Sequence, residues 1–385
     1  MLQRVLGVLL LALLAHEAGG ATITVRKDGT GDYSVLHLAV NAAADGDTIL
    51  IGPGEFTETK SVLLPGWGIY VATHGDVLVR ELTIVGAGAG VTVIGPASYS
   101  WNGTYGPHGL SMARTEHDLH VSDLTIRNCY SGLYLLGSLS MQRCELRNND
   151  VGVDARLVGG TNIVSNCRFS GQDAYPPMGI YSALTSAALQ VEDCDFDGAQ
   201  AYVSNSEVAF RGCHFRGGTV AVKVMNGAHG QLWDCDIADV SIGLTTYLGS
   251  PPSRCDIHSS RIAGSTAALL IDQRTSATVE GSVLTGGSNS IVYASDAEAL
   301  TISGCDFVKG TGPILLCHRP AAWGAVTYDL TNNYWGTTDQ AMIQSWIIDS
   351  HDDFNIYATV LYTPFAGQSV PAETTTWGDL KALFR

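Results

Sequence analysis

Residues 189–215 read LQVEDCDFDGAQAYVSNSEVAFRGCHF and contain one short pattern twice. An apolar residue precedes two polar or small residues, then Cys, any residue and a second apolar residue, as in Val191-x-x-Cys194-x-Phe196. Outward from this stretch the pattern recurs from Ile126-x-x-Cys129 to Leu330-x-x-Asn333, ten matches in all, with Ser or Asn sometimes replacing Cys. The Cys positions span 333 − 129 = 204 residues over nine intervals, a mean of about 23. A fixed period of this size indicates a solenoid, whose units bury their apolar faces by stacking.

The second half of each unit distinguishes a β-helix from a leucine-rich repeat, which shares part of the pattern. A leucine-rich repeat continues into a helical segment. Here the units continue through a Gly-containing turn into a second alternating run, such as TVAVKV at 219–224 and SIVYAS at 290–295. Alternation with a period of two indicates strands. We therefore predict an all-β fold, a single-stranded right-handed parallel β-helix with a short N-terminal capping helix and a C-terminal cap.

The nine cysteines have two possible roles, packing or disulfide formation. Side chains in the same position of stacked coils point in parallel and lie about 4.8 Å apart. The Cβ atoms of a disulfide approach more closely than that, and Ser260, Ser282 and Asn333 replace Cys in the repeat. We predict that most of the cysteines are small buried packing residues, and we expect Cys317, which lies outside the pattern, to be an exposed thiol.

The ends of the chain differ from the repeat. A basic Arg4, an apolar run over 5–15 and small residues over 18–21 predict a secretory signal peptide at 1–21. We expect an N-terminal cap and first strand at 22–57, the β-helix at 58–335, a C-terminal cap at 336–366, and a polar tail with a short helix at 367–385. Helical spacing predicts a capping helix within 33–44 that turns Val35, Leu38 and Ala42 towards the first coil, and another helix within 338–348.

Charge and hydropathy restrict the partners. A net charge of −16 argues against nucleic acids and anionic membranes, which both attract basic surfaces. A polyuronate would also be repelled unless a divalent cation bridged the carboxylates. No later apolar run is long enough to cross a bilayer. We expect a monomer without a transmembrane segment that is secreted or located in the periplasm or at the cell surface.

Several motifs resemble those of a known superfamily. The segments Asp28-Gly-Thr-Gly-Asp-Tyr33, Asp45-Gly-Asp-Thr-Ile49 and Gly52-Pro-Gly-Glu-Phe56 resemble the opening of pectin-lyase-like β-helix proteins. The coils over 119–335 resemble parallel β-helix repeats, and NNYWG at 332–336 resembles the closing coil of secreted bacterial β-helix proteins. The resemblance implies the fold, but its members include lyases, hydrolases, esterases, epimerases and non-enzymatic adhesins. The chain shows no counterpart of the catalytic motifs of pectin methylesterases, polygalacturonases or pectate lyases, so whether it is an enzyme stays open.

Acidic residues flank the Cys positions in two coils. If the coils stack in register, Asp195, His214 and Asp236 form one outward column, and they are the candidate catalytic residues. Asp193 and Asp234 stand beside Asp195 and Asp236, and clustered carboxylate oxygens of this kind suit Ca²⁺. The alternative is a solvated acidic face without a ligand.

An aromatic segment over 99–108 is the candidate carbohydrate-binding site. Its Tyr99, Trp101, Tyr105 and His108 could present ring faces to a sugar, or the loop could fold onto the coils and bury them. The sequence therefore favours a secreted protein that binds or processes an extracellular polysaccharide or cell-surface glycan. A non-catalytic, adhesin-like scaffold is the alternative, and a periplasmic metal-handling protein is a weaker one.

Overall fold

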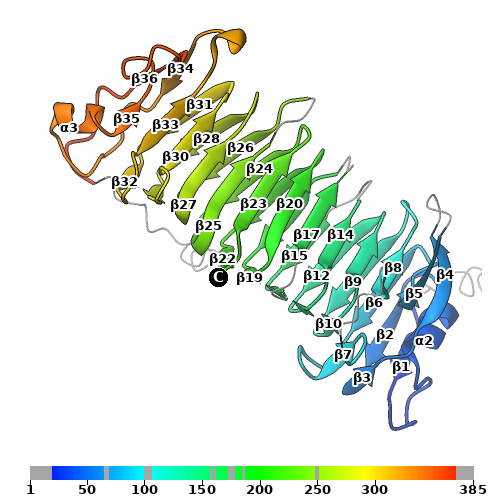
Figure 1. The fold of residues 1–385 in the computed structure, drawn as a ribbon. Coiled ribbons are helices and arrows are strands. Elements are labelled where there is room, and N and C mark those ends of the chain that lie inside the picture. Colours follow the sequence, from blue (N-terminus) through cyan, green and yellow to red (C-terminus); the bar gives the residue numbers. More distant parts are fainter. Residues whose placement is uncertain are drawn as a thin grey trace, which may run out of the picture.

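Each repeat forms one coil of three short strands, and successive coils stack into the elongated right-handed solenoid of Figure 1. This computed structural model describes residues 20–64, 69–98, 106–156, 159, 162–171, 178–183, 187–247 and 251–369. A strand pairs in parallel with the strand in the same position of the next coil, so the strands line three faces, here called the first, second and third face in chain order. The predicted all-β, right-handed parallel β-helix is confirmed.

The first face is a 14-stranded sheet. Its strands are β1 (Thr22–Val25), β2 (Asp47–Ile51), β6 (Glu81–Val85), β9 (Asp118–Ser122), β12 (Ser138–Gln142), β15 (Asn162–Ser165), β18 (Leu189–Glu192), β21 (Glu207–Arg211), β24 (His229–Trp233), β26 (Arg254–His258), β28 (Ser276–Glu280), β31 (Ala299–Ser303), β34 (Val326–Asp329) and β36 (Ala358–Leu361).

The second and third faces belong to one 22-stranded sheet, because β25 (Asp236–Thr246) and β27 (Arg261–Ile271) run through both. The second face otherwise contains β3 (Gly54–Phe56), β7 (Thr92–Ile94), β10 (Thr125–Arg127), β13 (Glu145–Arg147), β16 (Arg168–Ser170), β19 (Asp195–Asp197), β22 (His214–Arg216), β29 (Val283–Thr285) and β32 (Asp306–Val308). The third face otherwise contains β5 (Ile69–Asp76), β8 (His108–Met112), β11 (Ser131–Leu135), β14 (Val151–Ala155), β17 (Met178–Ala183), β20 (Gln200–Ser204), β23 (Val220–Met225), β30 (Val292–Ser295), β33 (Leu315–His318) and β35 (Ile347–Ile348). An antiparallel strand, β4 (Lys60–Leu64), pairs with β5.

The chain turns from the first face to the second at a residue with a left-handed backbone. This residue directly precedes the Cys of the repeat, as at Asn166 (φ 52°), Asp193 (φ 51°) and Gly212 (φ 59°). Asn, Asp and Gly tolerate positive φ better than other residues. The repeat pattern therefore contains a turn signal as well as apolar positions.

The residues that follow these turns form a buried line along the solenoid, here called the corner column. Its members are Cys144, Cys167, Cys194, Cys213, Cys235, Ser260, Ser282, Cys305 and Asn333. The backbone N–H of Cys144 donates to Sγ of Cys167 over 3.4 Å, and the N–H of Cys305 donates to Oδ1 of Asn333 over 2.8 Å. Cys, Ser and Asn replace one another here because each is a small side chain that accepts a hydrogen bond from a buried N–H.

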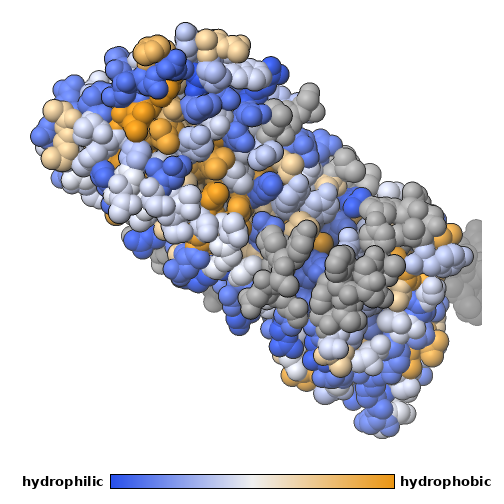
Figure 2. Space-filling model, viewed as in Figure 1, coloured by the Kyte–Doolittle hydropathy of each residue, from blue (hydrophilic) through white to orange (hydrophobic). Residues whose placement is uncertain are grey.

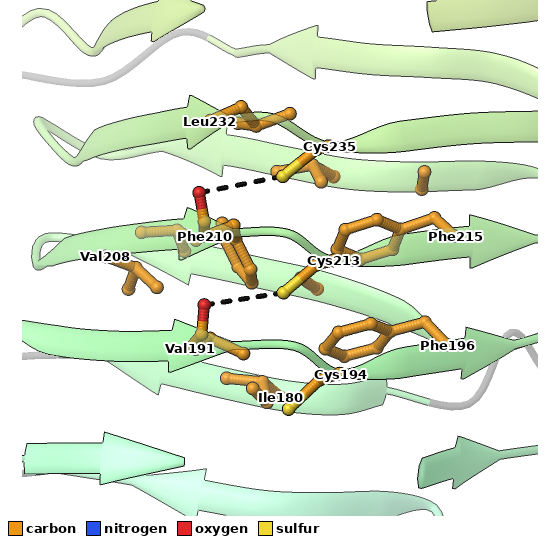
Figure 3. Close-up of a cluster of buried hydrophobic side chains, with 14 of the residues drawn as sticks. Ile180, Val191, Cys194, Phe196, Val208, Phe210, Cys213, Phe215, Leu232 and Cys235 are labelled. Carbon is orange, nitrogen blue, oxygen red and sulfur yellow. Dashed lines mark hydrogen bonds between the residues drawn. The ribbon is translucent and has the colours of Figure 1, made fainter. Parts of the chain in front are cut away.

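The thiols of the corner column also act as donors. Figure 3 shows Sγ of Cys213 pointing to the carbonyl oxygen of Val191 in the preceding coil, at 3.4 Å. All nine cysteines are free and buried, so the predicted role as packing residues is confirmed. The expectation for Cys317 is wrong, because its position in β33 leaves it only 2% exposed, and burial raises the pKa of its thiol.

The first match of the repeat pattern, Ile126-x-x-Cys129, occupies a different position in its coil from the later matches. Ile126 pairs with Leu146 on the second face, which aligns Cys129 with Asn149 rather than with Cys144. The N–H of Cys129 donates to Oδ1 of Asn149 over 2.9 Å. Cys129 therefore occupies the corner between the second and third faces.

Aromatic rings stack through the core of the central coils. The ring centroid of Phe196 lies 4.7 Å from that of Phe169 and 4.3 Å from that of Phe215, and the three ring planes are nearly parallel. Glycines make room for them across the core: a Cβ on Gly152 would lie 2.9 Å from the ring of Phe169, and one on Gly179 would lie 2.8 Å from the ring of Phe196. Substitution of these glycines would force apart well-packed groups.

A short helix, α2 (Leu36–Ala42), covers the N-terminal end of the core. It buries Leu36, Ala39 and Val40, whereas Leu38 is 47% exposed. The expected helix is therefore present but shorter than predicted, and the prediction that Leu38 faces the first coil is wrong. Three residues at i, i+3 and i+4 define the buried side instead. At the other end lie a single 3₁₀ turn, η1 (Ala321–Trp323), and α3 (Gln340–Gln344), whose first turn is capped by Asp339.

Both open edges of the first face are covered by side chains and turns. At β1, the N–H of Thr24 donates to Asp32 and its carbonyl accepts from Tyr33. At β36, the N–H of Val360 donates to Asp349. These bonds occupy part of each exposed edge, which makes pairing with a further strand less favourable.

The visible surface is mostly hydrophilic, with apolar residues gathered in patches over the C-terminal half (Figure 2). No helix within the described residues is long and apolar enough to span a membrane. The predicted signal peptide and terminal tail lie largely outside the described residues and stay predictions.

Candidate functional site

The predicted column of Asp195, His214 and Asp236 is present on the second face. Asp195 pairs with His214 and His214 pairs with Asp236 in the sheet register. Nδ1 of His214 lies 3.3 Å from Oδ1 of Asp195. The geometry expected from in-register stacking is therefore confirmed, while the catalytic role stays a prediction.

The same column is longer than the sequence indicated, and its charges alternate. In order along the solenoid it contains Glu145, Arg168, Asp195, His214, Asp236 and Arg261. Arg168 pairs with Asp197 at 3.0 Å and Arg216 pairs with Asp236 at 2.8 Å, each across one coil. Cross-strand pairs of opposite charge stabilise neighbouring strands. Asp236 is thus engaged by an arginine, which weakens its candidacy for catalysis.

The four aspartates predicted to bind Ca²⁺ do not converge. Asp193 and Asp234 occupy the left-handed turns, and two coil steps separate Asp195 from Asp236. Within the described residues, no group of three or more His, Cys, Asp or Glu side chains is arranged to hold a metal ion. The expectation that Asp193, Asp195, Asp234 and Asp236 form one calcium site is therefore wrong in its geometry.

The surface has two open hollows of about 520 and 580 Å³. The larger of these two lies where the first and second faces meet. This corner groove has a volume of about 580 Å³, and Ala89 and Gly90 contribute to its lining. Three consecutive coils each supply two polar side chains to its floor: Arg143 and Glu145, Asn166 and Arg168, Asp193 and Asp195. Two of the predicted site residues, Asp193 and Asp195, therefore belong to a real depression, whereas Asp234 and Asp236 do not line it.

The charges in and around the corner groove are largely paired. Arg143 donates from Nε and Nη2 to both carboxylate oxygens of Asp123, at 2.7 and 2.6 Å. These bonds hold the pKa of Asp123 below its usual value. Thr125 donates to Glu145 over 3.1 Å. The groove thus presents oriented polar groups without a large excess of one charge.

The aromatic segment is only partly described. Tyr99, Trp101 and Tyr105 lie outside the described residues, and their predicted contact with carbohydrate stays a prediction. His108 opens β8 and is 1% exposed, with its ring edge-on to Tyr130 and Tyr134. The prediction that His108 belongs to an exposed carbohydrate platform is therefore wrong, and its burial lowers its pKa to about 4.

A second polar cluster lies on the outer side of the first face and was missed by sequence reasoning. This first-face cluster consists of Glu207, His229, Gln231, Arg254 and Asp256, from β21, β24 and β26. Nε2 of His229 lies 2.8 Å from Oδ2 of Asp256, and Arg254 donates to both carboxylate oxygens at 3.1 and 2.6 Å. Burial by itself would raise the pKa of Asp256, but the bonds from Arg254 and His229 outweigh it and lower the pKa.

An aromatic stack adjoins this cluster. The ring centroids of Trp233 and His258 lie 3.9 Å apart in nearly parallel planes, and the guanidinium of Arg211 lies over the ring of Trp233, 5.2 Å from its centroid. The signal was available in the sequence, because HGQLW at 229–233 and RCDIH at 254–258 alternate polar or aromatic residues with buried ones. These residues lie in the strands before the Cys positions, so the Cys-centred repeat pattern does not include most of them.

Comparison with known proteins supports the fold alone. A family model described as "Right handed beta helix region" matches residues 179–307, about a third of the chain. No significant match was found among curated proteins or among solved structures. The match falls on the central coils, from β17 to β32. The stacked coils and this match show that the chain has a right-handed parallel β-helix fold.

Proposed function

We propose that the protein binds an extracellular polysaccharide in the corner groove, with the glycan chain lying along the solenoid axis. The observation that supports this is the groove of about 580 Å³ whose floor is built by three consecutive coils. Each coil contributes one side chain from the left-handed turn and one from the following strand. A linear ligand with a regular repeat would meet a similar pair of polar groups at each coil.

The polar groups suit hydroxyl-rich ligands. Asn166, Asp193 and Asp195 provide acceptors, and Arg168 provides donors, for the directional bonds that sugar hydroxyls make. Because Arg143 and Arg168 already pair with Asp123 and Asp197, little unpaired positive charge is left for a polyanion. We therefore expect a neutral polysaccharide to bind better than a polyuronate.

Affinity electrophoresis and calorimetry against a panel of neutral and acidic polysaccharides would test the proposal. Arg168→Ala and Asp195→Asn should each weaken binding at least several-fold, since each removes groups from the groove floor. Arg261→Ala is the matched control, because Arg261 is an exposed arginine of the same column beyond the groove. It should leave binding unchanged.

Two outcomes would contradict the proposal. Binding that is equal in the wild type and in both groove variants would place the glycan elsewhere. An absence of binding to every polysaccharide in the panel would favour the scaffold role instead. Measurements with calcium and with a chelator would show whether a bridging cation contributes.

A further inference from the structure

His229 of the first-face cluster is held in one orientation by its neighbours. Its Nε2 lies 2.8 Å from Oδ2 of Asp256, a carboxylate that is only 7% exposed. Because Asp256 also accepts two bonds from Arg254, it acts as a fixed, ionised acceptor. A carboxylate on one ring nitrogen places the proton there and leaves the other nitrogen as the base.

The second ring nitrogen of His229, Nδ1, lies next to the side-chain amide of Gln231 and the carboxylate of Glu207. The side-chain amide of Gln231 lies 3.4 Å away, and a carboxylate oxygen of Glu207 lies 3.6 Å away. The side chain of His229 is 28% exposed and that of Glu207 is 53% exposed, so solvent and a ligand can reach this side of the ring. Gln231 also donates to Glu207 over 2.9 Å, which orients its amide beside Nδ1.

The cluster fits hydrolysis of an acyl group better than hydrolysis of a glycoside. Glycoside hydrolysis commonly uses two carboxyl groups, one acid and one base. Here Asp256 is occupied by Arg254 and His229, so only Glu207 has a carboxylate open to a substrate. A single oriented imidazole with an amide donor beside it instead suits activation of water for attack on an acyl group.

We propose that the first-face cluster hydrolyses carboxylic esters, with His229 as the general base and Asp256 as its positioning residue. Nδ1 of His229 takes a proton from water while the water oxygen bonds to the ester carbonyl carbon. The carbonyl oxygen carries the negative charge and accepts a hydrogen bond from the second N–H of Gln231, which faces Nδ1 at 3.4 Å in the free protein and turns to the ester, while the first N–H stays on Glu207. The bond from that carbon to the alkoxy oxygen then breaks, and the proton passes from Nδ1 to the leaving oxygen, giving one acid and one alcohol.

This activity is independent of glycan binding in the corner groove, because it uses none of the groove residues. The probe is para-nitrophenyl acetate, and the hydrolysis rate is measured on the full chain as a function of pH. His229→Gln should lower the rate by about 100-fold or more, as expected for loss of a general base. His318→Gln, at an exposed histidine outside the cluster, should leave the rate unchanged.

Asp256→Asn separates positioning from a structural role. The amide no longer stabilises a protonated imidazole, so the rate should fall and the rising limb of the pH profile should move to lower pH. Circular dichroism of each variant would establish that the coils are intact.

Three outcomes would overturn the proposal. They are a wild-type rate no greater than that of free imidazole at equal concentration, an unchanged rate in His229→Gln, and an unmoved pH profile in Asp256→Asn. Cleavage of para-nitrophenyl glycosides in preference to the acetate would also overturn it, because it would assign the cluster to glycoside chemistry.

Discussion

Two buried histidines, His74 and His108, make the protein sensitive to acid. They are 0% and 1% exposed, and burial lowers the pKa of each to about 4. Nδ1 of His74 bonds to the carbonyl of Glu58, whereas neither ring nitrogen of His108 has a hydrogen-bond partner in the described part of the chain. Both rings are therefore neutral in the folded protein near pH 7.

The sign and size of the effect follow from proton linkage. In the unfolded chain each histidine titrates near 6.5, so between about pH 6.5 and pH 4 the unfolded state binds more protons than the folded state. Stability is then lost as the pH falls through this window and is regained as it rises. At about 1.4 kcal/mol per pH unit, each histidine contributes a loss of about 3 kcal/mol by pH 4.

His108→Phe tests this reasoning, because phenylalanine keeps a ring against Tyr130 and Tyr134 but cannot be protonated. The free energy of unfolding in urea would be measured at pH 7 and pH 4. We expect the variant to be at least as stable as the wild type at pH 7, since no hydrogen bond is lost. Its loss of stability between the two pH values should be smaller by about 3 kcal/mol.

The matched control is His318→Phe, at a histidine whose side chain is 62% exposed. Its free energy of unfolding should fall between pH 7 and pH 4 by the same amount as that of the wild type. If His108→Phe and the wild type lost the same free energy between pH 7 and pH 4, the assigned role of His108 would be refuted.

Two further predictions concern the cap and the thiols. Leu36→Asp should destabilise the protein by about 3–5 kcal/mol in thermal or urea unfolding, because it buries an uncompensated charge, while Leu38→Asp on the exposed side of α2 should change little. Equal effects of the two substitutions would contradict the orientation of the helix. A thiol reagent should find nine reactive cysteines after denaturation without reductant and almost none in the native protein. Fewer than nine in the denatured protein would reveal disulfides and contradict the free state of the cysteines in this structure.

The fold was predictable because its signals are local and repeat many times. Apolar positions two residues apart, such as Leu189 and Val191 in β18, mark strands with one buried side. The sequence is less informative where a signal occurs only once. The seven residues of α2 are too few for their spacing to distinguish Leu36 from Leu38 as the buried leucine. Ile126 and Cys129 match the repeat pattern although they lie on the second face and at the following corner.

The candidate site was predictable only in part. In-register stacking correctly placed Asp195, His214 and Asp236 in one column, but it did not show that Arg216 pairs with Asp236 of the next coil. Side-chain reach across a coil depends on rotamers and on neighbours, which a one-dimensional pattern does not contain. For the same reason the sequence suggested a calcium site where the structure has alternating charges.

The sequence by itself determined the period, the strands and the packing role of most of the cysteines, because each depends on residues close together in the chain. Only the tertiary structure decided which outward side chains meet. Successive Cys positions at 144, 167, 194 and 213 are 23, 27 and 19 residues apart, since the turns between faces absorb insertions of different length. Contacts such as His229 with Asp256 therefore depend on the register in which the sheet pairs. That register is set by burial of the inward side chains, so the outward neighbours follow from the packing of the core.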